Sequence, residues 1–192
     1  MLEHRLITRL LLIFCLPPST ALAEPETRIN TVYYQVEGNT AEAIWADIIA
    51  KLPVKENGKQ HVAYTRWHLN WQFWWTDHGS SCEISKLTTK LDVTYTLPRL
   101  KQNASMPQSV TAHWEKYYAA LLDHEQGHKG LGVKAALELE NKLLNMGPRR
   151  DCKQLELDAN SMGKSVINKY SQTEKEYDRS TNHGLNTGAV FP

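Results

Sequence analysis

The sequence predicts an α+β fold in a single domain, in which a small antiparallel or mixed sheet packs on two long helices. Two segments between residues 66 and 97 alternate apolar and polar residues, which is the period of a strand. Two later segments, 107–146 and 152–173, repeat apolar residues every three or four positions, which is the period of a helix. No repeat and no Gly/Ser-rich linker divides the chain, so these elements are expected to share one core.

The N-terminal residues have the features of a bacterial export signal. A positively charged start precedes the short apolar run Leu10 to Leu16, and Ala21-Leu22-Ala23 is a small-residue cleavage site. The apolar run is too short for a permanent membrane span. We therefore expect a signal peptide at 1–23 and a secreted or periplasmic domain at 24–192, with an uncleaved N-terminal anchor as the alternative.

Charge and cysteine content agree with an exported protein that does not bind nucleic acid. The chain has 22 basic and 21 acidic residues, a formal net charge of +1, so no basic excess indicates a nucleic-acid partner. Cleavage would remove Cys15 and leave Cys82 and Cys152, which are expected to form a disulfide in an oxidising compartment. A two-cysteine metal site is less favoured, because neither cysteine has a second one at ligand spacing.

The first elements after the signal are expected to be a strand and a helix. Alternation at residues 32–37 predicts the strand, and Gly38 ends it. Asn39 or Thr40 can cap the helix. Its apolar face is expected to consist of Ile44, Trp45, Ile48 and Ile49.

The two clearest strands are expected to pair as a long hairpin around Asp77-His78-Gly79. The buried face of the first would carry Trp67, Leu69, Trp71, Phe73 and Trp75. The buried face of the second would carry Leu87, Leu91, Val93, Tyr95 and Leu97. We expect Pro98 to stop the second strand. The tryptophans are interpreted as sheet core rather than as a platform for a ligand.

The first long helix is expected to begin at Pro107 and to end at Gly147-Pro148. It contains the sequence His124-Glu125-Gln126-Gly127-His128, which has the order H-E-x-x-H. Two histidines four residues apart on a helix share one face and can bind one zinc ion. Glu125 can then act as the general base on a zinc-activated water.

A catalytic zinc ion usually has three protein ligands, and the sequence offers several candidates for the third. We favour His183, which Gly184 follows in a turn after the second helix, then Asp178, then Glu156. Asp178 could instead orient a ligand histidine, and Tyr177 could donate a hydrogen bond to a developing oxyanion.

Gly127 is unusual inside a helix, because glycine costs about 1 kcal/mol relative to alanine there. Either the missing side chain leaves room beside the ion or allows another segment to pack closely, or the helix kinks or ends near His128.

The sequences "HEQGH" and "YDRSTNHG", together with the two cysteines, resemble a bacterial family of predicted secreted zinc-dependent proteases. The resemblance extends from the first strand to His183. It implies a compact zincin-like domain with His124, His128 and His183 on zinc and Glu125 as general base.

The expected function is therefore that of an exported zinc metallohydrolase, a metalloprotease acting on a peptide or protein substrate. A non-catalytic protein of envelope binding or maintenance on a zincin scaffold is one alternative. A zinc amidase that acts on cell-wall material is the other.

Overall fold

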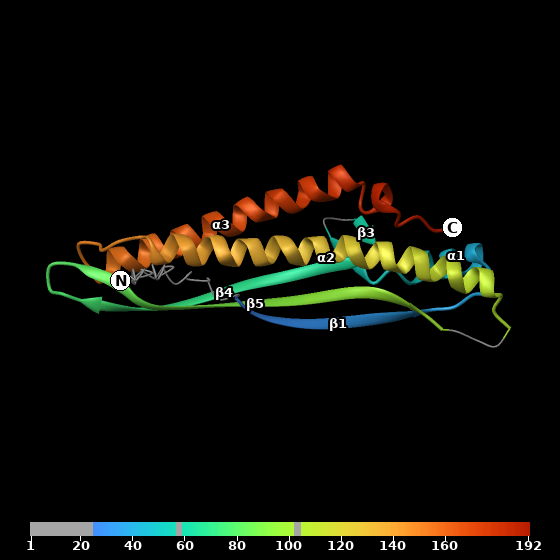
Figure 1. Ribbon diagram of the computed structural model, residues 1–192, viewed down its shortest axis with the longest axis horizontal. Helices are drawn as coiled ribbons and strands as arrows, with labels where there is room; N and C mark the ends of the chain where they lie inside the picture. The colour runs from blue at the N-terminus through green and yellow to red at the C-terminus, as the bar shows by residue number, and fades with distance from the viewer. Residues whose placement is uncertain (1–24, 57–58, 102–104) are drawn as a thin grey trace, which may run out of the picture.

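The computed structural model describes residues 25–56, 59–101 and 105–192, so the expected signal peptide lies outside the described residues. The described residues form an elongated molecule in which two long helices lie over a twisted sheet (Figure 1). The sheet has three strands in the order β1-β5-β4. The predicted α+β class with a mixed sheet and two long helices is confirmed.

The predicted hairpin is the centre of the sheet. Strands β4 (Tyr64–Asp77) and β5 (Cys82–Leu100) pair in antiparallel fashion along the full length of β4. Strand β1 (Glu26–Val36) lies parallel to β5 on its other side. The sequence had indicated β1 as a strand, shorter than observed, but not its partner.

Two details of the hairpin prediction are wrong. Pro98 does not stop β5, which continues to Leu100 in register with β1. Strand β4 begins opposite Thr96, so Pro98 lies where β5 has β1 alone as partner, a position that tolerates a missing N–H. Trp75 is 43% exposed near the hairpin turn, although its ring still lies 6.0 Å from that of Phe73 on the same strand.

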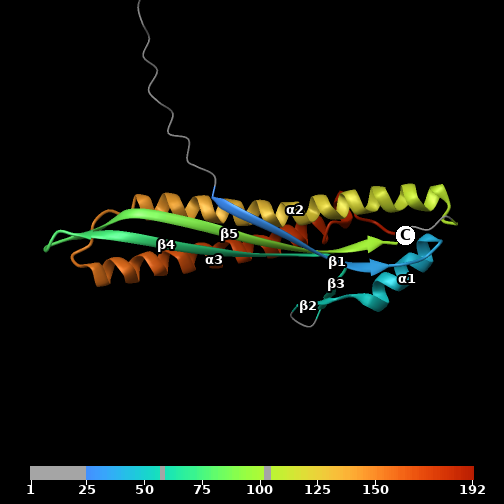
Figure 2. The same ribbon diagram turned by 90° about the horizontal axis from the view of Figure 1, so that it is seen from below.

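The helices follow the sequence prediction closely. Helix α2 (Gln108–Leu144) runs without interruption through the H-E-x-x-H segment, and α3 (Cys152–Thr181) returns alongside it. Viewed from the sheet side, both long helices lie behind the hairpin (Figure 2). The apolar side chains buried between the layers include Leu69, Leu91, Val93, Leu97, Leu139, Leu143, Ala159 and Val166.

The smaller elements lie in the half of the molecule where α2 begins (Figure 2). Helix α1 (Ala41–Lys51) is capped by Thr40, and the predicted face is correct for Ile44 and Ile48 but wrong for Ile49, which is 47% exposed. The elements that complete the chain are β2 (Val54–Glu56), β3 (Lys59–His61) and the 3-10 turn η1 (Leu185–Thr187). No helix among the described residues is long and apolar enough to cross a membrane.

Two tryptophans join the sheet to the helices at positions where the helices carry glycine. A Cβ on Gly132 would lie 2.9 Å from Cγ of Trp67, and one on Gly163 would lie 2.4 Å from Cζ2 of Trp71. The Trp71 indole N–H also donates to Asn160 of α3 at 3.2 Å. The prediction that these tryptophans belong to the core is therefore confirmed.

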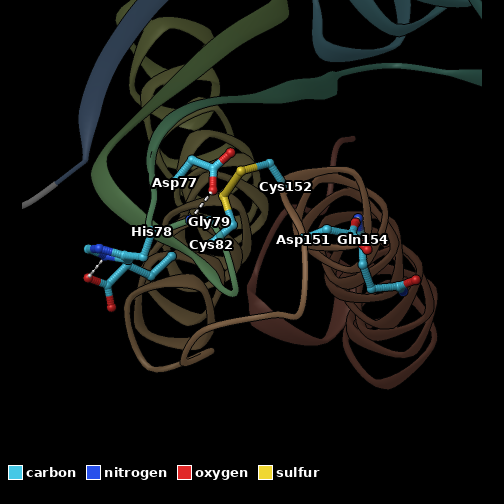
Figure 3. Close-up of a disulfide and its surroundings, with 8 residues drawn as sticks. Asp77, His78, Gly79, Cys82, Asp151, Cys152 and Gln154 are labelled. Atoms are coloured by element: carbon cyan, nitrogen blue, oxygen red, sulfur yellow. Dashed lines mark hydrogen bonds and ion pairs between the residues drawn. A yellow bond between two sulfur atoms is a disulfide. The ribbon is translucent and has the colours of Figure 1, made fainter.

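The predicted disulfide joins Cys82, the first residue of β5, to Cys152, the first residue of α3 (Figure 3). Beside it, Cys82 and Arg149 exchange two backbone hydrogen bonds of 2.8 and 2.7 Å. Asp151 caps α3 by accepting from the backbone N–H of Gln154 at 2.7 Å. The turn of the hairpin and the connection between the long helices are thus fixed to each other, as an oxidising, extracytoplasmic environment would permit.

Candidate metal centre

Helix α2 presents His124 and His128 toward the last turns of α3, and both histidines are buried. Asp178 of α3 faces them, with its Oδ1 3.2 Å from His124 Nε2 and 3.0 Å from His128 Nε2. One ligand atom from each of these three residues lies within 4.8 Å of the others, so this group could hold a metal ion. Two imidazoles and a carboxylate are a donor set that suits zinc.

His183 stands at the rim of this group. Its Nδ1 lies 3.5 Å from the same Asp178 oxygen, and its side chain is 55% exposed. Three imidazole nitrogens therefore surround one carboxylate oxygen. The geometry ranks Asp178 ahead of His183 as the third ligand, and the ligand role of His183 stays a prediction.

The backbone that carries His183 is strained. Asn182 and His183 both adopt positive φ values, 50° and 52°, which non-glycine residues rarely hold. The His183 N–H donates to the Asp178 carbonyl at 2.8 Å, which closes the end of α3. Gly184 follows with φ +87°, and a Cβ on it would lie 3.1 Å from His124 Cγ. The turn is thus packed directly against a candidate ligand.

Glu156, the remaining candidate for the third ligand, lies elsewhere. It is exposed near the start of α3, 22 residues before Asp178. At the rise of an α-helix this separation is about 33 Å. Glu156 therefore does not share a site with His124 and His128.

Glu125 is buried between α2 and the sheet, beside the two histidines. The Thr65 hydroxyl of β4 is 2.6 Å from Glu125 Oε2 and 3.1 Å from the Glu125 backbone carbonyl. Burial raises the pKa of the Glu125 carboxyl, and the Thr65 hydrogen bond and the nearby histidines offset only part of this effect. A carboxyl with a raised pKa is suited to exchanging protons near neutral pH.

Asp178 and His128 hold each other in ionised form when no metal is bound. Burial alone would raise the pKa of Asp178, but hydrogen bonds with His124 and His128 lower it well below its ordinary value. Burial alone would lower the pKa of His128, but hydrogen bonds with Asp178 and Glu174 raise it to about 10. A metal ion would therefore displace a proton from His128, because only neutral imidazole is a ligand.

Tyr177 packs against both histidines. Its ring is stacked on His124 at 5.0 Å and 9°, and lies edge-on to His128 at 5.0 Å and 87°. Its hydroxyl donates to the His124 backbone carbonyl at 3.3 Å. In this arrangement the hydroxyl is directed at the main chain of α2, so the predicted oxyanion role has no geometric support.

The same contact explains Gly127. A Cβ at this position would lie 2.1 Å from the Tyr177 hydroxyl oxygen. Close packing of another segment is therefore the interpretation of this glycine that is confirmed, and a helix end is wrong, since α2 continues through this position to Leu144.

Three residues of this region were not identified from the sequence: Thr65, Trp67 and Glu174. Thr65 lies on the same face of β4 as Trp67 and Trp71. A polar residue on a face predicted to be buried could therefore have indicated it from the sequence. Trp67 was assigned to the core, but its contact with Glu174 was not foreseen. Glu174 had no such signal, because its neighbours depend on how α3 is rotated against α2.

A family model described as a bacterial protein of unknown function (DUF922) matches residues 31–184. No curated protein and no solved structure gives a match. The matched range contains both the H-E-x-x-H helix and the turn that carries His183. The chain therefore belongs to the DUF922 family of bacterial proteins, whose function is unknown.

Proposed function

We propose that this protein is an exported zinc-dependent hydrolase that cleaves peptide bonds. The observation that carries the proposal is the convergence of His124, His128 and Asp178 within 4.8 Å, beside the buried carboxyl of Glu125. The disulfide is compatible with an extracytoplasmic location. The family match supplies no activity, so the proposal rests on the chemistry of these side chains.

The residues that would hold zinc are His124, His128 and Asp178, with His183 close enough to join or replace Asp178. When bound, zinc makes water more acidic and polarises a carbonyl group. Tyr177 limits the rotation of both imidazoles by packing against them. The protein thereby presents its donor atoms with little freedom to reorient.

Glu125 supplies the proton transfer. Thr65 engages its Oε2, which leaves Oε1 to accept a proton from the attacking water and to deliver it to the leaving amine. The pKa raised by burial brings the carboxyl closer to the pH at which it works. Glu125 takes part in no metal group found among the described residues, so its role is separable from zinc binding.

Strand β4 favours a peptide as substrate. It is an edge strand that, among the described residues, pairs with β5 alone. Its residue Thr65 contacts Glu125, so the strand passes directly beside the proposed base. An extended peptide can add to such an edge through main-chain hydrogen bonds.

The decisive experiment compares Glu125→Gln with Glu115→Gln, an exposed position on the same helix. Zinc content is measured by mass spectrometry, and cleavage is followed with a quenched-fluorescent peptide library and with purified peptidoglycan. We expect Glu125→Gln to keep its zinc and to lose about 10²- to 10⁴-fold in peptide cleavage, while the control keeps both.

Other outcomes separate the alternatives. A zinc-loaded wild type that cleaves neither substrate would support the non-catalytic envelope protein. Cleavage of peptidoglycan alone would support the amidase. Full peptide cleavage by Glu125→Gln would contradict the proposed role of this carboxyl.

A further inference from the structure

We propose that Glu174 is a positioning residue for the metal ligand His128, and that Trp67 holds Glu174 in place. This inference rests on the proposed zinc site, and it extends that site to a third element of the fold. It concerns the ring nitrogen of His128 that does not face Asp178.

The two ring nitrogens of His128 face two different carboxylates. Nε2 lies 3.0 Å from Asp178 Oδ1, and Nδ1 lies 3.5 Å from Glu174 Oε1. If Nε2 binds the metal, the ring proton is on Nδ1, and the Glu174 carboxylate is the nearby group that can accept it. A metal-binding histidine usually donates its second N–H to such a group, which fixes the tautomer and makes the imidazole a stronger ligand.

Glu174 is itself held by the sheet. The Trp67 indole N–H donates to the same Oε1 at 2.7 Å. The indole lies against α2 at Gly132, where a Cβ would be 2.9 Å from Trp67 Cγ. A chain of contacts thus connects α2, β4 and α3, running from Gly132 to Trp67, then to Glu174 and then to His128. Without a side chain at Gly132 the indole can approach closely enough to direct its N–H at Glu174.

His124 has a different partner at the corresponding nitrogen. Its Nδ1 lies 3.4 Å from the Thr181 hydroxyl, whose proton is donated to the Tyr177 carbonyl at 2.8 Å. The hydroxyl oxygen is therefore left to accept from His124. His124 thus faces a neutral hydroxyl, whereas His128 faces a carboxylate. His128 is therefore expected to be the stronger metal ligand of the two.

The test compares Glu174→Gln, which keeps the shape of the side chain, with Glu176→Gln. Glu176 lies on the same helix, is 61% exposed and pairs with Arg179. The zinc dissociation constant is measured on the full mature chain by competition with a chelator. We expect Glu174→Gln to bind zinc about 10- to 100-fold more weakly and Glu176→Gln to match the wild type.

Two further measurements distinguish positioning from a structural role. The visible spectrum of the cobalt-substituted protein should shift in Glu174→Gln, because the donor strength of His128 changes. Trp67→Phe keeps an aromatic ring against Gly132 and removes the N–H together with part of the indole volume. It should weaken zinc binding less than Glu174→Gln but in the same direction.

The inference is overturned if Glu174→Gln lowers the melting temperature of the metal-free protein but leaves zinc affinity and the cobalt spectrum unchanged. If Glu174→Gln does not fold, wild-type zinc affinity in Trp67→Phe overturns it instead. A wild type that binds no zinc would overturn the proposed function as well. The two failures are therefore told apart by the wild-type measurement.

Discussion

The two ends of the α2–α3 pair are built on different principles. At one end, the Cys82–Cys152 disulfide and the paired backbone groups of Cys82 and Arg149 close the structure with bonds that need no ligand. At the other end, His124, His128 and Asp178 crowd buried, ionisable groups into one place. The disulfide end restricts the conformations of the chain and so stabilises the fold. The end with the candidate ligands instead buries titratable side chains, which costs free energy of folding.

Under the proposed function, this difference separates stability from function along the molecule. The disulfide lies at the first residue of α3 and Asp178 lies 26 residues later, which is about 39 Å along the helix. Over such a distance, changes at one end are expected to add to those at the other rather than to couple with them. Substitutions at the two ends can therefore test the separation.

The largest effect is expected from removing the disulfide with Cys82→Ser and Cys152→Ser together. The bond closes a sequence separation of 70 residues, so its loss should cost about 4 kcal/mol of unfolding free energy. Chemical denaturation measures this cost. The folded variant should bind zinc as tightly as the wild type, and a large loss of zinc affinity would show that the two ends are coupled.

A smaller effect is expected from Gly127→Ala at the other end. The added Cβ would meet the Tyr177 hydroxyl oxygen at 2.1 Å, and overpacking of this kind costs about 1 to 3 kcal/mol. Denaturation should show the loss together with weaker zinc binding. Ala substitution at Gly130 is the control, because no atom lies within 4 Å of its added Cβ. Equal effects at both positions would argue for helix propensity instead of the Tyr177 contact.

Tyr177→Phe should have a small effect, about 1 kcal/mol or less, because it removes one hydrogen bond to the His124 carbonyl and keeps the ring. Zinc affinity and any cleavage rate should stay near those of the wild type. A fall of about 10²- to 10³-fold in the cleavage rate would instead restore the oxyanion role predicted from the sequence.

The metal-free protein should lose stability as the pH rises from about 6.5 to about 10. The folded state raises the pKa of His128 to about 10, so it binds a proton that the unfolded chain releases in this range. The stabilisation by protonated His128 is fully present below the ordinary histidine pKa of about 6.5 and is lost as the pH rises through the raised pKa of about 10. Melting temperatures of the chelator-treated protein measure it, and His128→Gln should flatten the profile. An equally steep profile in that variant would assign the titration to another group.

The sequence was sufficient for elements whose signal is local. The hairpin, both long helices and the shared face of His124 and His128 follow from periodicity, and the disulfide follows from the two cysteines that were expected to remain after export. Pro98 was misassigned because its edge position depends on strand register. The alternation of apolar and polar residues along a strand does not reveal which residues of the neighbouring strand it pairs with.

The incomplete part of the site has a similar cause. The height and rotation of α3 against α2 decide that Asp178 meets both histidines and that Glu174 meets His128. These parameters are set by contacts such as Tyr177 against Gly127 and Trp67 against Gly132. The glycines inside the helix indicated that another segment could pack closely there. The sequence did not indicate which side chains would fill that space.

The most direct test of the proposed metal centre is zinc per chain in the purified protein, before and after mild chelation, beside His128→Ala and Asp178→Ala. We predict about one zinc ion per wild-type chain and its loss from both variants under the same treatment. A wild type that binds no zinc even after reconstitution would contradict the central claim. Zinc retained in Asp178→Ala but lost from His183→Ala would keep the metal centre and make His183 its third ligand.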